Sequence, residues 1–180
     1  MKYEKAIALL DSPDTWCQGA KKLVRLGDRA AVLPMLRAYE SRAEADKLCL
    51  LDAMEELGAS SLSHELFEAT GADERRMAVH LMELFFDDSH LPYLELAAVD
   101  EDDKVRRQGL RSVATQRQTP AWEATMIRLL DAERVDTRGE AVTSLARRRT
   151  DTAREALRRR LEVETDPALR ERLAEAIVSD

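Results

Sequence analysis

The chain has 180 residues, and its 28 Lys and Arg against 35 Asp and Glu give a formal net charge of −7 at pH 7. Hydrophobic residues make up 44% of the chain, which is enough to build a core and excludes a wholly disordered protein. Aromatic residues make up only 4%, and Gly and Pro are few, which argues against the turns and aromatic strands of an all-β sandwich.

Apolar residues recur at spacings of three and four along the chain, a pattern typical of amphipathic helices. We expect a short first helix near residues 2–11 and a lone closing helix at 166–179, both acting as caps. Between them the pattern predicts five helix pairs, at residues 13–41, 42–70, 73–99, 102–132 and 134–163. Capping side chains before proline mark helix starts, as in Thr119-Pro120 and Asp166-Pro167.

One spacing recurs through these pairs: an anchor residue, a small or apolar residue three positions later, and an apolar residue four beyond that. The anchors are Trp16, Lys47, Arg75, Arg106, Arg138 and Arg170, at intervals of 31, 28, 31, 32 and 32 residues. A helix pair cannot bury both of its apolar faces alone, so pairs with such a constant period must stack. We therefore predict an all-α fold, a right-handed α-solenoid of about five helix pairs that forms one domain over residues 1–180.

Small residues and cysteines also carry expectations. Gly19, Ala78, Gly109 and Ala141 follow anchors by three positions, where they would let neighbouring helices approach closely. Cys17 and Cys49 each lie in a helical pattern, where a lone cysteine usually behaves as a small buried hydrophobe. The apolar runs are far shorter than the roughly 20 residues of a membrane span, and the first residues do not resemble a secretory signal. We expect a reduced, cytoplasmic protein with no membrane segment.

The segment Asp103-Lys104-Val105-Arg106, followed by Gly109 and Val113, resembles the HEAT-repeat family in its short form, which includes the repeats named after phycobilisome lyases. The resemblance covers nearly the whole chain and implies a binding scaffold, because this fold serves many unrelated partners. It also implies that each recurring arginine holds an acidic residue of a neighbouring repeat. We call these four residues the arginine ladder: Arg75, Arg106, Arg138 and Arg170.

A partner protein would lie across the concave face that stacked second helices form. The exposed second-helix positions expected on this face are Arg37, His64, Glu68, Tyr93, Glu123, Arg154 and Arg158. The net charge is −11 over residues 1–103 and +4 over residues 104–180. A partner of reversed polarity would associate faster with such a surface.

Other functions stay open at this point. The arginine-rich stretch 147–160 could bind nucleic acid or a phosphate ligand, since arginine binds phosphate oxygens in pairs. However, no aromatic residue is interleaved for base stacking, and the net charge opposes polyanions. A lyase-like or chaperone role and a toxin-neutralising inhibitor are further alternatives that the family resemblance leaves open.

No catalytic, cofactor-binding or metal-binding residue is predicted. The pair His64-Glu65 occurs once, whereas the HEAT-like deoxyhypusine hydroxylases bind iron with several such pairs. The acidic stretches 87–88 and 100–103 fall at helix junctions, where carboxylates favour the following helix N-terminus. Glycine-rich nucleotide motifs are missing from the sequence. We expect a monomer without a cofactor that is not an enzyme and that binds another protein.

Overall fold

The computed structural model describes residues 2–12, 14–40, 47–68 and 71–178, and every regular element in these ranges is helical. The α-helices are, in chain order, α1 (Lys2–Ala8), α2 (Trp16–Leu26), α3 (Val32–Glu40), α4 (Leu48–Glu56), α5 (Ala59–Phe67), α6 (Ala72–Leu84), α7 (Leu91–Ala97), α8 (Asp103–Thr115), α9 (Pro120–Leu129), α10 (Val135–Arg148), α11 (Asp151–Val163) and α12 (Pro167–Val178). Short 3-10 helices end α1 and precede α3 and α7; they are η1 (Leu9–Asp11), η2 (Arg29–Ala31) and η3 (Asp88–His90).

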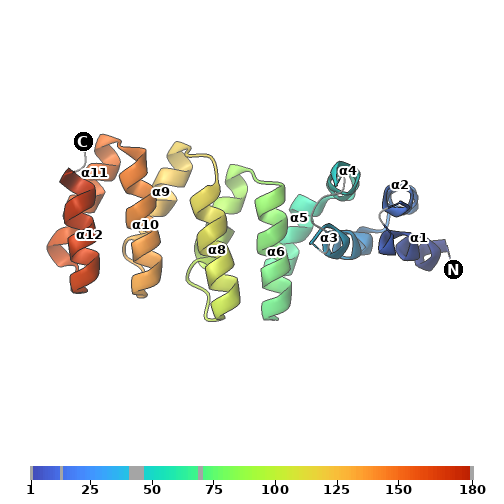
Figure 1. Cartoon of the computed structure of the whole chain (residues 1–180), viewed down its shortest axis with the longest axis horizontal. Helices are drawn as coiled ribbons and strands as arrows, with labels where there is room; N and C mark the ends of the chain where they lie inside the picture. The colour runs from blue at the N-terminus through green and yellow to red at the C-terminus, as the bar shows by residue number, and fades with distance from the viewer. Residues whose placement is uncertain (1, 13, 41–46, 69–70, 179–180) are drawn as a thin grey trace.

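The helices stack side by side into an elongated molecule with its termini at opposite ends (Figure 1). The helices α6, α8, α10 and α12 form a front row, and α5, α9 and α11 lie behind it. At the N-terminal end, α2 and α4 are seen nearly along their axes, so this end is turned relative to the front row. The fold is an all-α solenoid, as the repeat spacing predicts.

Side-chain caps begin the helices where the acidic and hydroxyl residues predict them. The Asp102 carboxylate accepts hydrogen bonds from the backbone N–H groups of Lys104 (2.9 Å) and Val105 (3.1 Å) at the start of α8. The Thr119 hydroxyl accepts one from Trp122 N–H (3.1 Å) at the start of α9. These contacts satisfy N–H groups that have no partner within the helix. Within the acidic stretch 100–103, Asp102 therefore serves helix initiation as expected, whereas Asp100 pairs with Arg75.

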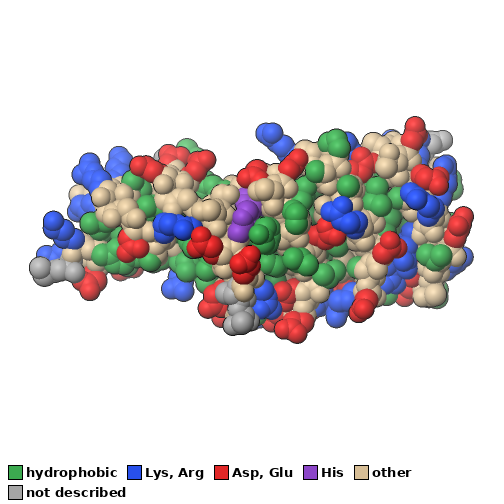
Figure 2. All heavy atoms as spheres, turned by 180° about the vertical axis from the view of Figure 1, so that it is seen from behind, with side chains coloured by type: hydrophobic (Ala, Val, Ile, Leu, Met, Phe, Trp, Pro, Cys, Tyr) green, Lys and Arg blue, Asp and Glu red, His purple; other side chains and the backbone are tan. Residues whose placement is uncertain are grey.

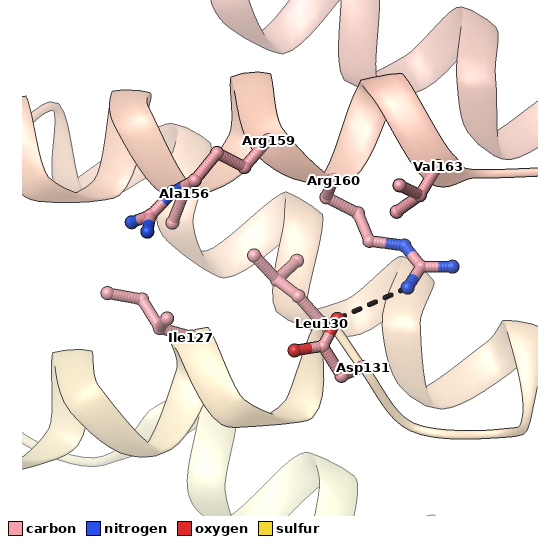
Figure 3. A pocket seen from close by; sticks show the side chains of 7 residues that line it. All are labelled: Ile127, Leu130, Asp131, Ala156, Arg159, Arg160 and Val163. Atoms are coloured by element: carbon pink, nitrogen blue, oxygen red, sulfur yellow. Dashed lines mark hydrogen bonds and ion pairs between the residues drawn. The ribbon is translucent and has the colours of Figure 1, made fainter.

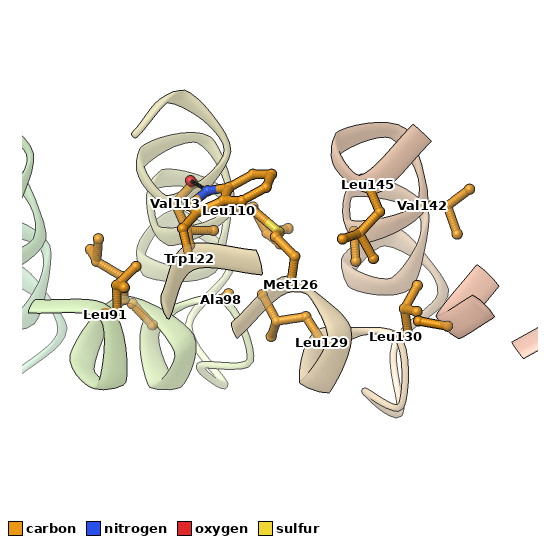
Figure 4. Packing of buried hydrophobic residues seen from close by; sticks show 14 of the residues in the cluster. Leu91, Ala98, Leu110, Val113, Trp122, Met126, Leu129, Leu130, Val142 and Leu145 are labelled. Atoms are coloured by element: carbon orange, nitrogen blue, oxygen red, sulfur yellow. Dashed lines mark hydrogen bonds between the residues drawn. The ribbon is translucent and has the colours of Figure 1, made fainter. Parts of the chain in front are cut away.

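The apolar core consists of two clusters that meet at α6. The N-terminal cluster runs from Ala6 to Leu81, and the C-terminal cluster runs from Phe67 to Leu173. Figure 4 shows the second cluster, in which the fully buried Trp122 lies against α8 and donates a hydrogen bond to the Val113 carbonyl (2.7 Å). The helix α6 contributes side chains to both clusters, so it joins them into one continuous stack.

Close helix packing depends on two of the small residues. A Cβ atom at Gly109 would lie 2.6 Å from the carbonyl carbon of Ala97, and one at Gly19 would lie 2.9 Å from the carbonyl oxygen of Ala6. Real Cβ atoms do not approach backbone so closely. Glycine is therefore required where α8 crosses the end of α7 and where α2 crosses α1.

The cysteines correct one expectation. The sulfur atoms of Cys17 on α2 and Cys49 on α4 are bonded, with their Cα atoms 5.6 Å apart, so the prediction of two separate thiols is wrong. The cysteines are 32 residues apart, which is about one repeat, and α2 and α4 pack against each other. Stacking of successive repeats brings equivalent positions together, and this is the physical reason for the pairing.

Candidate functional site

The arginine ladder uses its guanidinium groups to connect loops of the solenoid. Arg138 on α10 binds Glu164 through Nε and Nη2, each 2.8 Å from a carboxylate oxygen. Its Nη1 donates to the carbonyl oxygens of Ala132 (2.9 Å) and Glu133 (2.7 Å) in the preceding loop. One buried side chain therefore satisfies polar groups in the loops before and after its own repeat.

The other ladder arginines make related contacts. Arg75 binds Asp100 with two hydrogen bonds, of 2.7 and 3.0 Å. Arg106 donates to the Asp100 carbonyl oxygen (3.1 Å), and its Nε lies 3.5 Å from the Asp136 carboxylate. Arg170 donates to the carbonyl oxygen of Glu164 (2.8 Å), and no acidic partner for it occurs among the described residues.

These pairs shift the titration of their acids. Hydrogen bonds from Arg138 lower the pKa of Glu164 from 4.5 to about 2, even though burial acts in the opposite direction. Burial would also raise the pKa of Asp100, but the hydrogen bonds and charge of Arg75 outweigh it and hold that pKa below its usual value. The ladder thus holds ionised carboxylates inside the fold and presents little charge to a ligand.

The predicted partner-binding residues differ in exposure. Arg37, Glu68 and Arg158 are exposed, and Arg154 is half-buried and lies 3.7 Å from Asp151. Arg37 on α3 and Glu68 at the end of α5 lie towards the N-terminal half of the stack, whereas Arg154 and Arg158 on α11 lie near its C-terminal end, so the structure does not gather these side chains into one site.

Two other predicted residues pack against each other. The rings of His64 on α5 and Tyr93 on α7 stack with centroids 4.4 Å apart, and His90 meets His64 edge-on at 5.0 Å. Both His64 and Tyr93 are half-buried. The two rings connect α5 to α7 near the place where the two core clusters meet. This packing role explains the positions of His64 and Tyr93 better than exposure on a partner-binding surface does.

Glu123 was expected on the exposed face, and this expectation is wrong. Its side chain on α9 is buried, with the residue only 8% exposed. It lies 3.5 Å from the Arg148 guanidinium and accepts a hydrogen bond from the Thr150 hydroxyl. The loop that follows α10 folds over α9 and covers this carboxylate, an effect that helical periodicity within α9 cannot reveal.

The second helices α7, α9 and α11 form two neighbouring grooves instead. The first, of about 430 Å³, lies between α7 and α9 and includes the exposed apolar side chains Leu96 (57% exposed) and Val99 (45% exposed). An ion pair between Glu95 and Arg128, with a shortest separation of 2.6 Å, lies at its edge.

The second groove, of about 260 Å³, lies between α9 and α11 and is drawn in Figure 3. Ile127, Leu130 and Val163 supply its apolar surface, and Val163 is 63% exposed. Arg160 points across the groove to Asp131, and its Nη1 lies 3.2 Å from the carboxylate. Asp131 lines both grooves, so they form one surface, which we call the groove face.

Figure 2 views the molecule from the side of these second helices, and hydrophobic side chains lie there among charged ones over the C-terminal half. The sequence reasoning missed this surface because it selected polar residues on the second helices. A usable signal exists: Leu96 and Val163 are apolar residues outside the stripes that bury the core. The neighbours Arg159 and Arg160 line the second groove, whereas the predicted Arg154 and Arg158 do not.

Metal and membrane chemistry find no support in the part of the chain that the structure describes. It contains no group of three or more His, Cys, Asp or Glu placed to hold a metal ion. Nor does any helix there combine the length and the apolar character needed to cross a bilayer.

Comparisons with known proteins found one matching repeat family and a similar solved structure. The family model described as HEAT repeats matches residues 91–178. The crystal structure of an engineered protein is similar over 98% of this chain and 95% of its own, with 14% identity and a TM-score of 0.46. No curated protein matches the chain. The matched segment 91–178 carries α7 to α12 and both grooves, so the similarity to HEAT repeats covers the part of the chain that holds the groove face.

Proposed function

We propose that this protein is a non-enzymatic adaptor that binds a partner protein on the groove face. The observation that carries the proposal is the pair of adjoining grooves with three largely exposed apolar side chains, Leu96, Val99 and Val163. HEAT repeats generally mediate protein–protein interaction, which supports the same conclusion.

The groove face suits a helix as its ligand. Neighbouring packed helices lie about 8–10 Å apart, so two successive grooves repeat at about that distance. Two turns of a helix rise about 10 Å, so apolar residues seven positions apart in a partner helix would enter the two grooves. The ion pairs Glu95–Arg128 and Asp131–Arg160 would form the polar edge that surrounds such an apolar contact.

We also propose that the protein has no catalytic activity. The carboxylates that line the grooves, Glu95 and Asp131, are each engaged by an arginine, so neither is a free general base. The two arginines of the C-terminal stretch that line the second groove are occupied in the same way: Arg159 lies 3.8 Å from Glu155, and Arg160 binds Asp131 and Glu164. This pairing favours a protein partner over nucleic acid or a phosphate ligand there.

A double substitution tests the proposal. Leu96→Asp with Val163→Asp places a charge in each groove, and Val178→Asp makes the same change at an exposed position on α12 outside them. Tagged proteins are returned to the native cell, and the proteins that co-purify are quantified. The adaptor role predicts a partner that the wild type and Val178→Asp capture equally and the double variant loses.

The captured partner is then purified and its affinity measured by calorimetry. Charges in both grooves should weaken binding by about a hundredfold, since burying an unpaired charge costs several kcal/mol. Equal affinity of the wild type and the double variant would refute the groove face as the site.

The compartment and the oligomeric state complete the proposal. We place the protein in the cytoplasm as a monomer, and the Cys17–Cys49 bond offers a test of this compartment, because the cytoplasmic thiol pool reduces most disulfides. Alkylation of acid-quenched cells measures this directly. Complete oxidation of both cysteines in growing cells would instead indicate an oxidising compartment, and light scattering of the purified protein checks the monomer.

A further inference from the structure

A third groove, separate from the groove face, lies on the first helices of two successive helix pairs. It lies between α6 and α8, has a volume of about 480 Å³, and belongs to the front row of Figure 1. Its lining residues are Asp73, Arg76, Lys104, Arg107, Gln108 and Arg111. Four of these six side chains are cationic and one is anionic, although the whole chain has a net charge of −7. We call this site the basic groove.

The positive charge of the basic groove is only partly neutralised. Arg107 pairs with Asp103, and Arg76 lies 4.0 Å from Glu40. The side chains of Lys104 and Arg111 are exposed and form no ion pair with any residue in the described ranges. They therefore differ from the arginine ladder, whose guanidinium groups hold the fold together. Two cations without a structural task remain available to a ligand.

The spacing of these cations favours an extended ligand. Lys104, Arg107 and Arg111 follow one another at three and four positions on one side of α8, so the outer two lie about 10 Å apart. Arg76 faces them from α6 across the groove. Gln108, which is only 8% exposed, adds an amide that can both donate and accept a hydrogen bond.

An extended polypeptide rises about 3.3 Å per residue and turns alternate side chains to the same side. Three or four residues would span the cations on α8, and acidic side chains at every second position would meet them. Nucleic acid fits less well, because the lining has no aromatic side chain for base stacking and the chain as a whole is acidic.

From this geometry we infer that the basic groove binds an extended acidic segment of a partner protein through Lys104, Arg107, Arg111 and Arg76. The site is separate from the groove face, since it is built from α6 and α8 and shares no lining residue with the grooves between α7, α9 and α11. A single partner with an apolar helix and an acidic tail could engage both sites and gain affinity through the linkage.

The test uses the purified full chain and a fluorescent peptide of about eight alternating Glu and Gly residues. Anisotropy at about 50 mM salt should show binding that weakens as salt is added, because exposed charges are then screened. Lys104→Glu with Arg111→Glu reverses the two unpaired cations and should lower the affinity by about tenfold or more. A peptide with Gln in place of Glu should not bind.

The matched control is Lys21→Glu with Arg117→Glu, which makes the same charge change at exposed positions outside the groove. It should keep the wild-type affinity for the peptide. The variant Leu96→Asp with Val163→Asp should keep this affinity as well, because its substitutions lie in the groove face and test only the proposed function. Equal loss in the Lys21/Arg117 variant, or no binding to the wild type, would overturn the inference. A single-stranded oligonucleotide that binds more tightly than the peptide and loses affinity on the Lys104/Arg111 change would overturn it as well.

Discussion

The two ends of this solenoid are stabilised in different ways. In residues 2–68, a covalent bond between Cys17 and Cys49 fastens α2 to α4. In residues 71–178, ladder arginines connect successive loops through buried ion pairs and hydrogen bonds to backbone carbonyl groups. The apolar core divides at the same place, into two clusters that meet at α5 and α6, since both helices supply side chains to each cluster.

This difference shows that helix pairs of constant period can be held together by different interactions in different parts of the chain. At the N-terminal end, the anchor Trp16 is a buried aromatic residue that cannot replace the guanidinium contacts. A disulfide performs the corresponding task of holding adjacent first helices together. The two tryptophans make the comparison measurable, because Trp16 belongs to the N-terminal cluster and Trp122 to the C-terminal one. Single Trp→Phe backgrounds therefore report each end separately.

The largest expected effect comes from Arg138→Ala. It leaves the fully buried Glu164 carboxylate without its main partner, and such a change costs about 3–5 kcal/mol of unfolding free energy. Urea unfolding followed through Trp122 should show the loss, while Trp16 reports much less. The double change Arg138→Met with Glu164→Gln should cost less because no buried charge is left unpaired. A loss below about 1 kcal/mol for Arg138→Ala would mean that the ladder does not secure this end.

Reduction of the Cys17–Cys49 bond should produce the next largest effect, at the opposite end. The bond joins positions 32 residues apart, and a disulfide that closes such a loop typically contributes about 2–4 kcal/mol. Unfolding with and without reductant, read through Trp16, measures the loss. The variant Cys17→Ser with Cys49→Ser serves as the control, since reductant should not affect it. A reductant effect that appears equally at Trp122 would show that the two ends unfold together.

Gly109→Ala should have a smaller effect. The added Cβ meets backbone and side-chain atoms of Ala97 at 2.6 and 2.7 Å, and overpacking costs about 1–3 kcal/mol, of which about 1 is offset by better helix propensity. Gly139→Ala is the matched control, because its Cβ would meet the movable end of the Arg172 side chain at 2.9 Å. Thermal unfolding compares the two; a Gly139 change that costs as much as the Gly109 change would contradict the close approach of α7 and α8.

The smallest effect is the pH dependence of the stability of the C-terminal end in mildly acidic solution. The pKa of Glu164 is lowered from 4.5 to about 2, so its stabilising contribution is complete above the unfolded value and is lost as the pH falls from about 4.5 towards 2. Unfolding followed through Trp122 between about pH 6 and 4 should show the beginning of this loss. Glu164→Gln should remove that component of the slope. An unchanged slope in the variant would assign the dependence to other carboxylates.

Sequence periodicity predicted much of the fold. The expected pair at 134–163 contains α10 and α11, and the expected closing helix at 166–179 contains α12, because the core stripe of a helix follows directly from local spacing. The binding surface was less predictable. Glu123 lies on the correct helix but is covered by the loop after α10, and such a contact depends on residues 25–27 positions away.

The sequence by itself therefore determined the helices, their period, the close approach at Gly109 and the recurrence of the ladder arginines. Those features depend on neighbours within a few residues or on repetition. Only the tertiary structure decided which acid each arginine binds, that Cys17 reaches Cys49, and which exposed side chains line the grooves. These depend on how successive repeats stack, and one repeat placed on the next brings together atoms that no local pattern relates.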